Sequence, residues 1–135
     1  MKNMFKSFWK PIIWASIIFF LSALPGYDLN KATSFIAFPN FDKVGHATFY
    51  FVLCWLLVHA FQNTLRPKKS NKILSYFLAL FLCAIYGAII EYLQGCVFIQ
   101  RSKDIFDFIA NCSGAVSAAL FYYFLAPFIY KKKEE

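Results

Sequence analysis

The chain has 135 residues, of which 60% are hydrophobic and only 16% are charged. Soluble domains carry about a quarter charged residues and a smaller apolar share, so the composition excludes an ordinary water-soluble domain. The formal net charge is +7, but the basic residues form short clusters between long apolar runs. That distribution does not form a basic groove, and we expect no nucleic-acid partner.

Four apolar stretches predict four transmembrane helices, over residues of about 8–24, 44–61, 73–94 and 105–130. Eighteen helical residues extend about 27 Å, close to the roughly 30 Å thickness of the hydrocarbon core. Lipid offers the backbone no hydrogen-bond partners, and the alternating ten-residue strands of a barrel are absent, so the spans are expected to be helices. The predicted fold class is all-α, an antiparallel bundle of four transmembrane helices. An alternative for the first stretch is a cleaved signal peptide, because Lys2, Lys6 and Lys10 precede its apolar core.

The distribution of basic residues predicts the orientation of the bundle. Basic clusters occupy residues 2–10, 66–72 and 131–133, whereas the other two connections hold only Lys31, Lys43, Arg101 and Lys103. The positive-inside rule therefore puts both termini and the middle loop in the cytoplasm. Connections 25–43 and 91–104 are then expected to face outwards.

Polar residues gather where three predicted helices meet the outer face. They are Asp42, Lys43 and His46 at the start of the second span, Glu91 and Gln94 at the end of the third, and Arg101, Asp104, Asp107 and Asn111 at the start of the fourth. Asp42 and His46 are four residues apart, which puts them on the same side of a helix. An ionisable side chain facing lipid costs about 3 kcal/mol even on the lenient insertion scale. We therefore expect Asp107 to point into the bundle and to have a cationic partner.

These residues are interpreted as a polar pocket of head-group size. The candidate catalytic residues, which would transfer protons, are His46, Glu91 and Asp107. The candidate substrate-binding residues are Asp42, Lys43, Gln94, Arg101, Asp104 and Asn111, with the cationic members holding a phosphate or carboxylate. The alternative is a network that only joins helices, but such hydrogen bonds average about 0.6 kcal/mol in membranes, a weak reason for so many charges.

Metal binding is the weaker interpretation of the same residues. One histidine with several carboxylates suits a hard cation or zinc, but no HExxH-like pair fixes the geometry, so no metal or cofactor is predicted. His59 lies 13 residues beyond His46, about 20 Å along a helix, and is expected to lie outside the pocket. A stripe of small residues at Ala110, Gly114 and Ala118 predicts close approach of another helix of this chain.

In their order along the chain, these motifs resemble the VanZ-like family of small bacterial membrane proteins. The resemblance rests on Asp42-Lys43-x-x-His46, on Glu91-x-x-Gln94 and on Arg101-x-x-Asp104-x-x-Asp107-x-x-Ala110-Asn111-x-x-Gly114. It implies a multi-pass protein of the bacterial cytoplasmic membrane, with residues 1–135 as a single VanZ-like transmembrane domain. The family is named for a member linked to low-level teicoplanin resistance, so the resemblance implies a cell-envelope context.

Three functions remain open at this point. The first is an enzyme or modifier that acts on a lipid head group or a lipid-linked envelope precursor. The second is a non-catalytic protein that binds such lipids or scaffolds partner proteins. The third, a transporter subunit, is less favoured because neither a midplane site nor an inverted repeat is evident. Whether the protein is an enzyme stays undecided, and membrane lipids or lipid-linked precursors are the expected partners.

Overall fold

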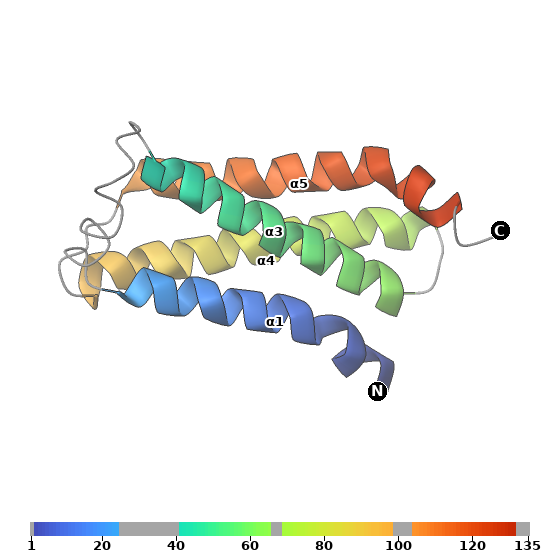
Figure 1. The fold of residues 1–135 in the computed structure, drawn as a ribbon, viewed down its shortest axis with the longest axis horizontal. Helices are drawn as coiled ribbons and strands as arrows, with labels where there is room; N and C mark the ends of the chain where they lie inside the picture. The colour runs from blue at the N-terminus through green and yellow to red at the C-terminus, as the bar shows by residue number, and fades with distance from the viewer. Residues whose placement is uncertain (1, 25–40, 66–68, 99–103, 132–135) are drawn as a thin grey trace.

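A computed structural model of the chain describes residues 2–24, 41–65, 69–98 and 104–131. These residues contain four helices and no strand: α1 (Lys2–Ala23), α3 (Phe41–Thr64), α4 (Lys69–Cys96) and α5 (Ile105–Lys131). The helices run alternately up and down in one elongated bundle, and both termini lie at the same end (Figure 1). The predicted all-α fold class is therefore confirmed.

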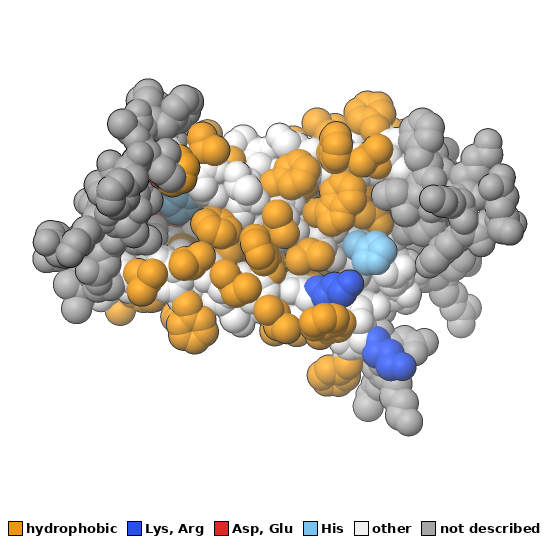
Figure 2. All heavy atoms as spheres, viewed as in Figure 1, with side chains coloured by type: hydrophobic (Ala, Val, Ile, Leu, Met, Phe, Trp, Pro, Cys, Tyr) orange, Lys and Arg blue, Asp and Glu red, His pale blue; other side chains and the backbone are white. Residues whose placement is uncertain are grey.

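Three of the four helices are long and apolar enough to cross a membrane. They are Phe41–Thr64, Asn71–Cys96 and Ile105–Leu125, which correspond to the second, third and fourth predicted spans. Large hydrophobic side chains, among them Phe77, Leu120 and Phe124, are exposed on their outer surfaces. Hydrophobic side chains also spread over the middle of the face in Figure 2, while the Lys side chains visible there lie towards the end that holds the termini. An apolar surface of this extent is typical of a protein in contact with lipid.

Helix α1 does not meet the same criterion within the described residues. A helix over the predicted first span is confirmed, but Lys6 and Lys10 occupy its N-terminal half. Only residues 11–23 remain beyond Lys10, about 20 Å of helix against the roughly 30 Å of the hydrocarbon core. The fourth transmembrane span, and with it the orientation in the membrane, stays a prediction.

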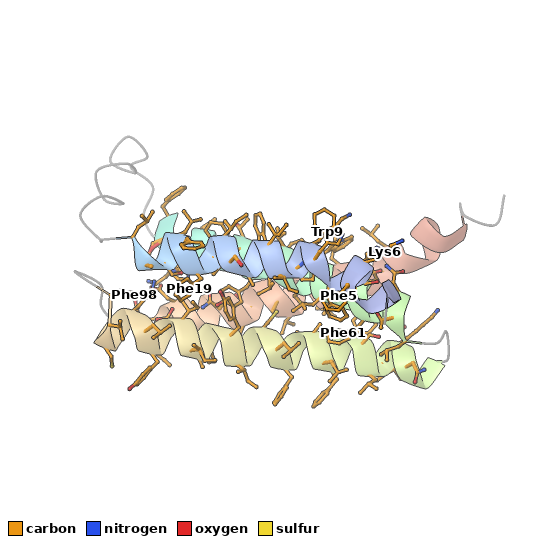
Figure 3. All side chains as sticks on the ribbon, turned by 90° about the horizontal axis from the view of Figure 1, so that it is seen from below. Phe5, Lys6, Trp9, Phe19, Phe61 and Phe98 are labelled. Carbon is orange, nitrogen blue, oxygen red and sulfur yellow. The ribbon has the colours of Figure 1, made fainter. Side chains whose placement is uncertain are left out.

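Contacts with α3 and α4 fix the position of α1 in the bundle. The indole N–H of Trp14 donates to the carbonyl of Phe49 at 2.9 Å, and the hydroxyl of Tyr86 donates to the carbonyl of Ala15 at 2.6 Å. Aromatic pairs lie near both ends of α1 (Figure 3). Phe8 packs edge-on against Phe61, and Phe19 packs against Phe98, just beyond α4. Helix α1 is thus an integral member of the bundle.

The most extensive helix pair is α3 with α5. The small-residue stripe of α5 makes this packing possible: Ala115 and Ala118 are buried, and Gly114 lies directly against the backbone of Ala47. A Cβ atom added at Gly114 would lie 2.8 Å from the Cα atom of Ala47 and 2.7 Å from its carbonyl carbon. The predicted role of the stripe in packing within the chain is confirmed.

Replacing Gly114 by alanine tests this backbone contact. Because the added methyl group meets backbone atoms that cannot rotate away, we expect Gly114→Ala to lower the free energy of unfolding by about 1–3 kcal/mol. The measurement is loss of helical circular dichroism during a titration with sodium dodecyl sulfate. Gly45→Ala is the matched control, because a Cβ atom at Gly45 meets nothing within 4 Å. Equal unfolding midpoints for the two variants would contradict the contact.

Candidate functional site

Six of the polar residues predicted from the sequence come together at the end of the bundle opposite the termini. Helices α3 and α5 begin at this end and α4 finishes there (Figure 1). Contacts between the described residues join six side chains, which we call the polar cluster: Lys43, His46, Glu91, Asp104, Asp107 and Asn111. Spacings of three and four residues give the members on each helix a common face. The cluster therefore draws on three helices that are distant in sequence.

Lys43 connects α3 to the start of α5 through two carboxylates. Its ammonium nitrogen lies 3.1 Å from Oδ2 of Asp104 and 3.1 Å from Oδ1 of Asp107. The side chains of Lys43 and Asp104 are each about one-third exposed, at 32% and 35%, whereas that of Asp107 is only 10% exposed. Asp107 thus points into the bundle and has a cationic partner, as predicted.

Asp104 also forms the N-cap of α5. Its Oδ1 atom accepts a hydrogen bond from the backbone N–H of Phe106 at 2.8 Å, which satisfies one of the free donors at the helix start. This bond and the ammonium of Lys43 hold the pKa of the Asp104 carboxyl below its usual range. Asp104 is therefore ionised at neutral pH and faces Lys43 as a charged group.

His46 is held between two residues of α5. Its Nδ1 atom lies 3.0 Å from Oδ1 of Asn111, and its Nε2 atom lies 3.6 Å from Oδ2 of Asp107. With the Asn111 amide as it is oriented in the structure, its oxygen only accepts hydrogen bonds, so Nδ1 of His46 is the donor and Nε2 is the nitrogen directed at the carboxylate. The two contacts fix the plane of the imidazole ring.

Glu91 and Gln94 bring α4 to the same end, and each is only 3% exposed. The Oε2 atom of Glu91 lies 3.4 Å from the backbone nitrogen of Asp104, a long hydrogen bond to the residue that caps α5. The other oxygen, Oε1, is buried and has no hydrogen-bond partner among the described residues. Glu91 thus places an unsatisfied carboxylate oxygen inside the protein.

Of the predicted residues that the structure describes, Asp42 and Gln94 make no contact that joins them to this network. Asp42 is exposed, and the contacts of His46 are with α5 instead of with Asp42 on its own helix. The reason is geometric: the inward face of α3 presents Lys43 and His46 to α5, whereas Asp42 lies towards the outside. Arg101 lies outside the described residues.

A comparison with protein families gives the context of this cluster. The family model described as VanZ/LLP1 matches residues 5–126, which include every member of the polar cluster. The chain belongs to this family. The resemblance drawn from the short motifs is thereby confirmed. No curated protein and no solved structure shows significant similarity to the chain.

Sequence reasoning missed one buried polar residue beside this cluster. Tyr50 is 1% exposed, and its hydroxyl has no hydrogen-bond partner among the described residues. Its ring lies close to Gly87, as does the amide nitrogen of Asn111, which is also buried and unsatisfied. Because Tyr50 follows His46 by four residues, the helical repeat could have identified it. The unsatisfied hydroxyl of Tyr50 thus extends the candidate site inwards beyond the cluster.

Proposed function

We propose that this VanZ/LLP1 protein crosses the bacterial cytoplasmic membrane four times, with both termini inside and the polar cluster facing outwards. The basic residues near the termini and in the middle loop support this orientation. The outer face of α1 supports the fourth span, because Ile12, Ile13 and Phe20 are exposed there. Lysines near the start of α1 can extend their ammonium groups to the membrane surface while their carbon chains remain in lipid.

We further propose that the polar cluster binds the phosphate-bearing head group of a membrane lipid or of a lipid-linked envelope precursor. The observation that carries this proposal is the burial of charged groups at one end of an otherwise apolar bundle, where helix ends meet the head-group region. An ammonium group has three N–H donors, and Lys43 uses two of them on Asp104 and Asp107. The third donor is available for a phosphate oxygen, and the partly exposed carboxylate of Asp104 is suited to an amine or hydroxyl of the same head group.

A groove beside the cluster supports a lipid as the ligand. It has a volume of about 390 Å³ and lies between α3 and α5 on the outside of the bundle. It begins at Val44, next to Lys43, and continues past Ala47 and Gly114 to Phe51 and Ser117. An acyl chain in this groove and a head group at Lys43 would belong to the same lipid molecule.

The interior of the cluster favours proton transfer to or from the bound head group. His46 is oriented between Asn111 and Asp107, and buried Glu91 has a free oxygen. Oriented acid–base groups of this kind are what a general acid or base requires. Binding without reaction uses only the partly exposed side chains of the cluster, Lys43 and Asp104. It remains the alternative function. Reaction with an envelope precursor, or binding of that precursor alone, would connect the protein to glycopeptide resistance.

Lipid retention by the purified protein tests the proposal. We expect native mass spectrometry of protein extracted in mild detergent to show one tightly held phospholipid or lipid-linked precursor per chain. Lys43→Gln removes a charge-assisted hydrogen bond to phosphate, so we expect it to weaken retention about tenfold or more. Ser117→Phe fills the groove and should weaken retention without changing any charge.

Lys10→Gln is the matched control, because it removes one exposed lysine from the other end of the bundle. We expect it to retain lipid like the wild type. The proposal is contradicted if the wild type retains no lipid, or if Lys43→Gln, with native helical content, retains as much as Lys10→Gln.

The orientation has a separate test in thiol labelling of spheroplasts with a membrane-impermeant maleimide. Cys96 is exposed and Cys112 is partly buried, so both are first replaced by serine, while buried Cys54 and Cys83 are kept. We expect a single cysteine at residue 30 or residue 100 to react and one at residue 67 to remain unlabelled until the membrane is permeabilised. The opposite pattern would place the polar cluster in the cytoplasm and would overturn the proposed orientation.

A further inference from the structure

Three side chains of the polar cluster direct electron-pair-bearing atoms at one another. His46, Glu91 and Asp107 each supply one potential ligand atom, and these atoms all lie within 4.8 Å of one another. They come from α3, α4 and α5. Glu91 and Asp107 are both buried, so water has little access to the space between them.

The hydrogen bond between His46 and Asn111 determines which ring nitrogen of His46 can act as a ligand. With the Asn111 amide as it is oriented in the structure, Nδ1 of His46 donates to the amide oxygen. In the neutral ring the Nε2 atom then carries a lone pair, and it faces Oδ2 of Asp107 at 3.6 Å. Histidines that bind metals generally donate their other ring N–H to an oxygen, which orients the ring and increases the basicity of the ligand nitrogen. Asn111 performs that function here.

Glu91 supplies an independent indication of a ligand. Its Oε1 atom is buried and has no hydrogen-bond partner among the described residues. A buried carboxylate oxygen without a donor or a cation is costly, because the charge has lost its hydration without compensation. A cation bound between Glu91, His46 and Asp107 would satisfy that oxygen.

The charges of the described residues favour a divalent ion. Three carboxylates, those of Glu91, Asp104 and Asp107, meet a single ammonium, that of Lys43. Lys43 contacts Oδ1 of Asp107, whereas His46 contacts Oδ2, so the oxygen on the histidine side is not the one bound to the ammonium. With all three carboxylates ionised and His46 neutral, a cation of charge +2 balances the cluster.

We propose that His46, Glu91 and Asp107 bind a divalent transition-metal ion, of which Zn²⁺ and Mn²⁺ are the test cases. Imidazole together with two carboxylates suits these ions better than Ca²⁺ or Mg²⁺, which prefer oxygen ligands alone. Ligands of a tetrahedral zinc lie roughly 3.4 Å apart, so small rotations of the side chains close the site around the ion. Three protein ligands leave at least one coordination position open. If the proposed lipid binding holds, a head-group phosphate oxygen is the natural occupant of that position, but metal binding itself does not depend on lipid.

Metal binding by the delipidated full-length protein tests this inference. The protein, in detergent and with Cys96 and Cys112 changed to serine, is stripped with a chelator and dialysed against Zn²⁺ or Mn²⁺. We expect one ion per chain by elemental mass spectrometry. Glu91→Gln keeps the size of the side chain but removes a charged ligand, and we expect it to weaken binding at least about 100-fold. Asp42→Asn removes an exposed carboxylate near the same end, and His59→Ala removes the other histidine, so both controls should bind like the wild type.

A second measurement does not depend on how well a variant folds. Co²⁺ bound to the wild type should give the intense visible absorption of a site with four or five ligands, and added Zn²⁺ should abolish it. The inference is overturned if the wild type binds less than stoichiometric metal, or if a folded Glu91→Gln variant binds as tightly as Asp42→Asn. Lipid retention without metal binding would contradict this inference alone, and metal binding without lipid retention would contradict only the proposed function.

Discussion

The direct contact between the backbones of α3 and α5 is the constraint on which the site depends. Because Gly114 has no side chain, α5 lies against the main chain of Ala47. Lys43 is one turn before Ala47, and Asp107 is two turns before Gly114, about 10 Å along α5. The short separation of the two helices therefore lets Lys43 reach both Asp104 and Asp107, and lets His46 reach Asn111 and Asp107. With a wider separation of the helices, these polar groups would have no partners. They would face lipid or lie too far apart to interact.

The polar cluster stands out because nearly everything around it is apolar. Interhelical hydrogen bonds in membranes contribute well under 1 kcal/mol on average, whereas burying an ionisable group costs several. Structural reinforcement alone would be achieved more simply by the aromatic and small residues that pack the rest of the bundle. The unsatisfied atoms of Tyr50, Glu91 and Asn111 add to that cost. Together these features favour a ligand site in this member of the VanZ/LLP1 family.

Much of this arrangement follows from the sequence because helix geometry in lipid is strongly constrained. Span length and hydropathy predicted α3, α4 and α5, and the cost of an exposed charge predicted the inward direction of Asp107. The sequence did not determine which partners would meet, because contacts between helices depend on their rotation and separation. Hence Asp42 was grouped with His46 although it is exposed, and Tyr50 was overlooked although it follows the same helical repeat. The first stretch formed a helix as expected, but Lys6 and Lys10 shorten its apolar part.

The ammonium of Lys43 and the carboxylate of Asp107 meet inside the bundle, and the rest of the polar cluster depends on this contact. Solid-state nuclear magnetic resonance of the protein in lipid bilayers can measure the distance from Nζ of Lys43 to Cγ of Asp107, with a Lys43→Gln sample to assign the signal. The nitrogen-to-oxygen separation of 3.1 Å predicts a nitrogen-to-carbon distance below about 4.5 Å. A distance beyond about 6 Å would mean that the helices do not bring these groups together. The polar cluster described here would then not exist in the membrane.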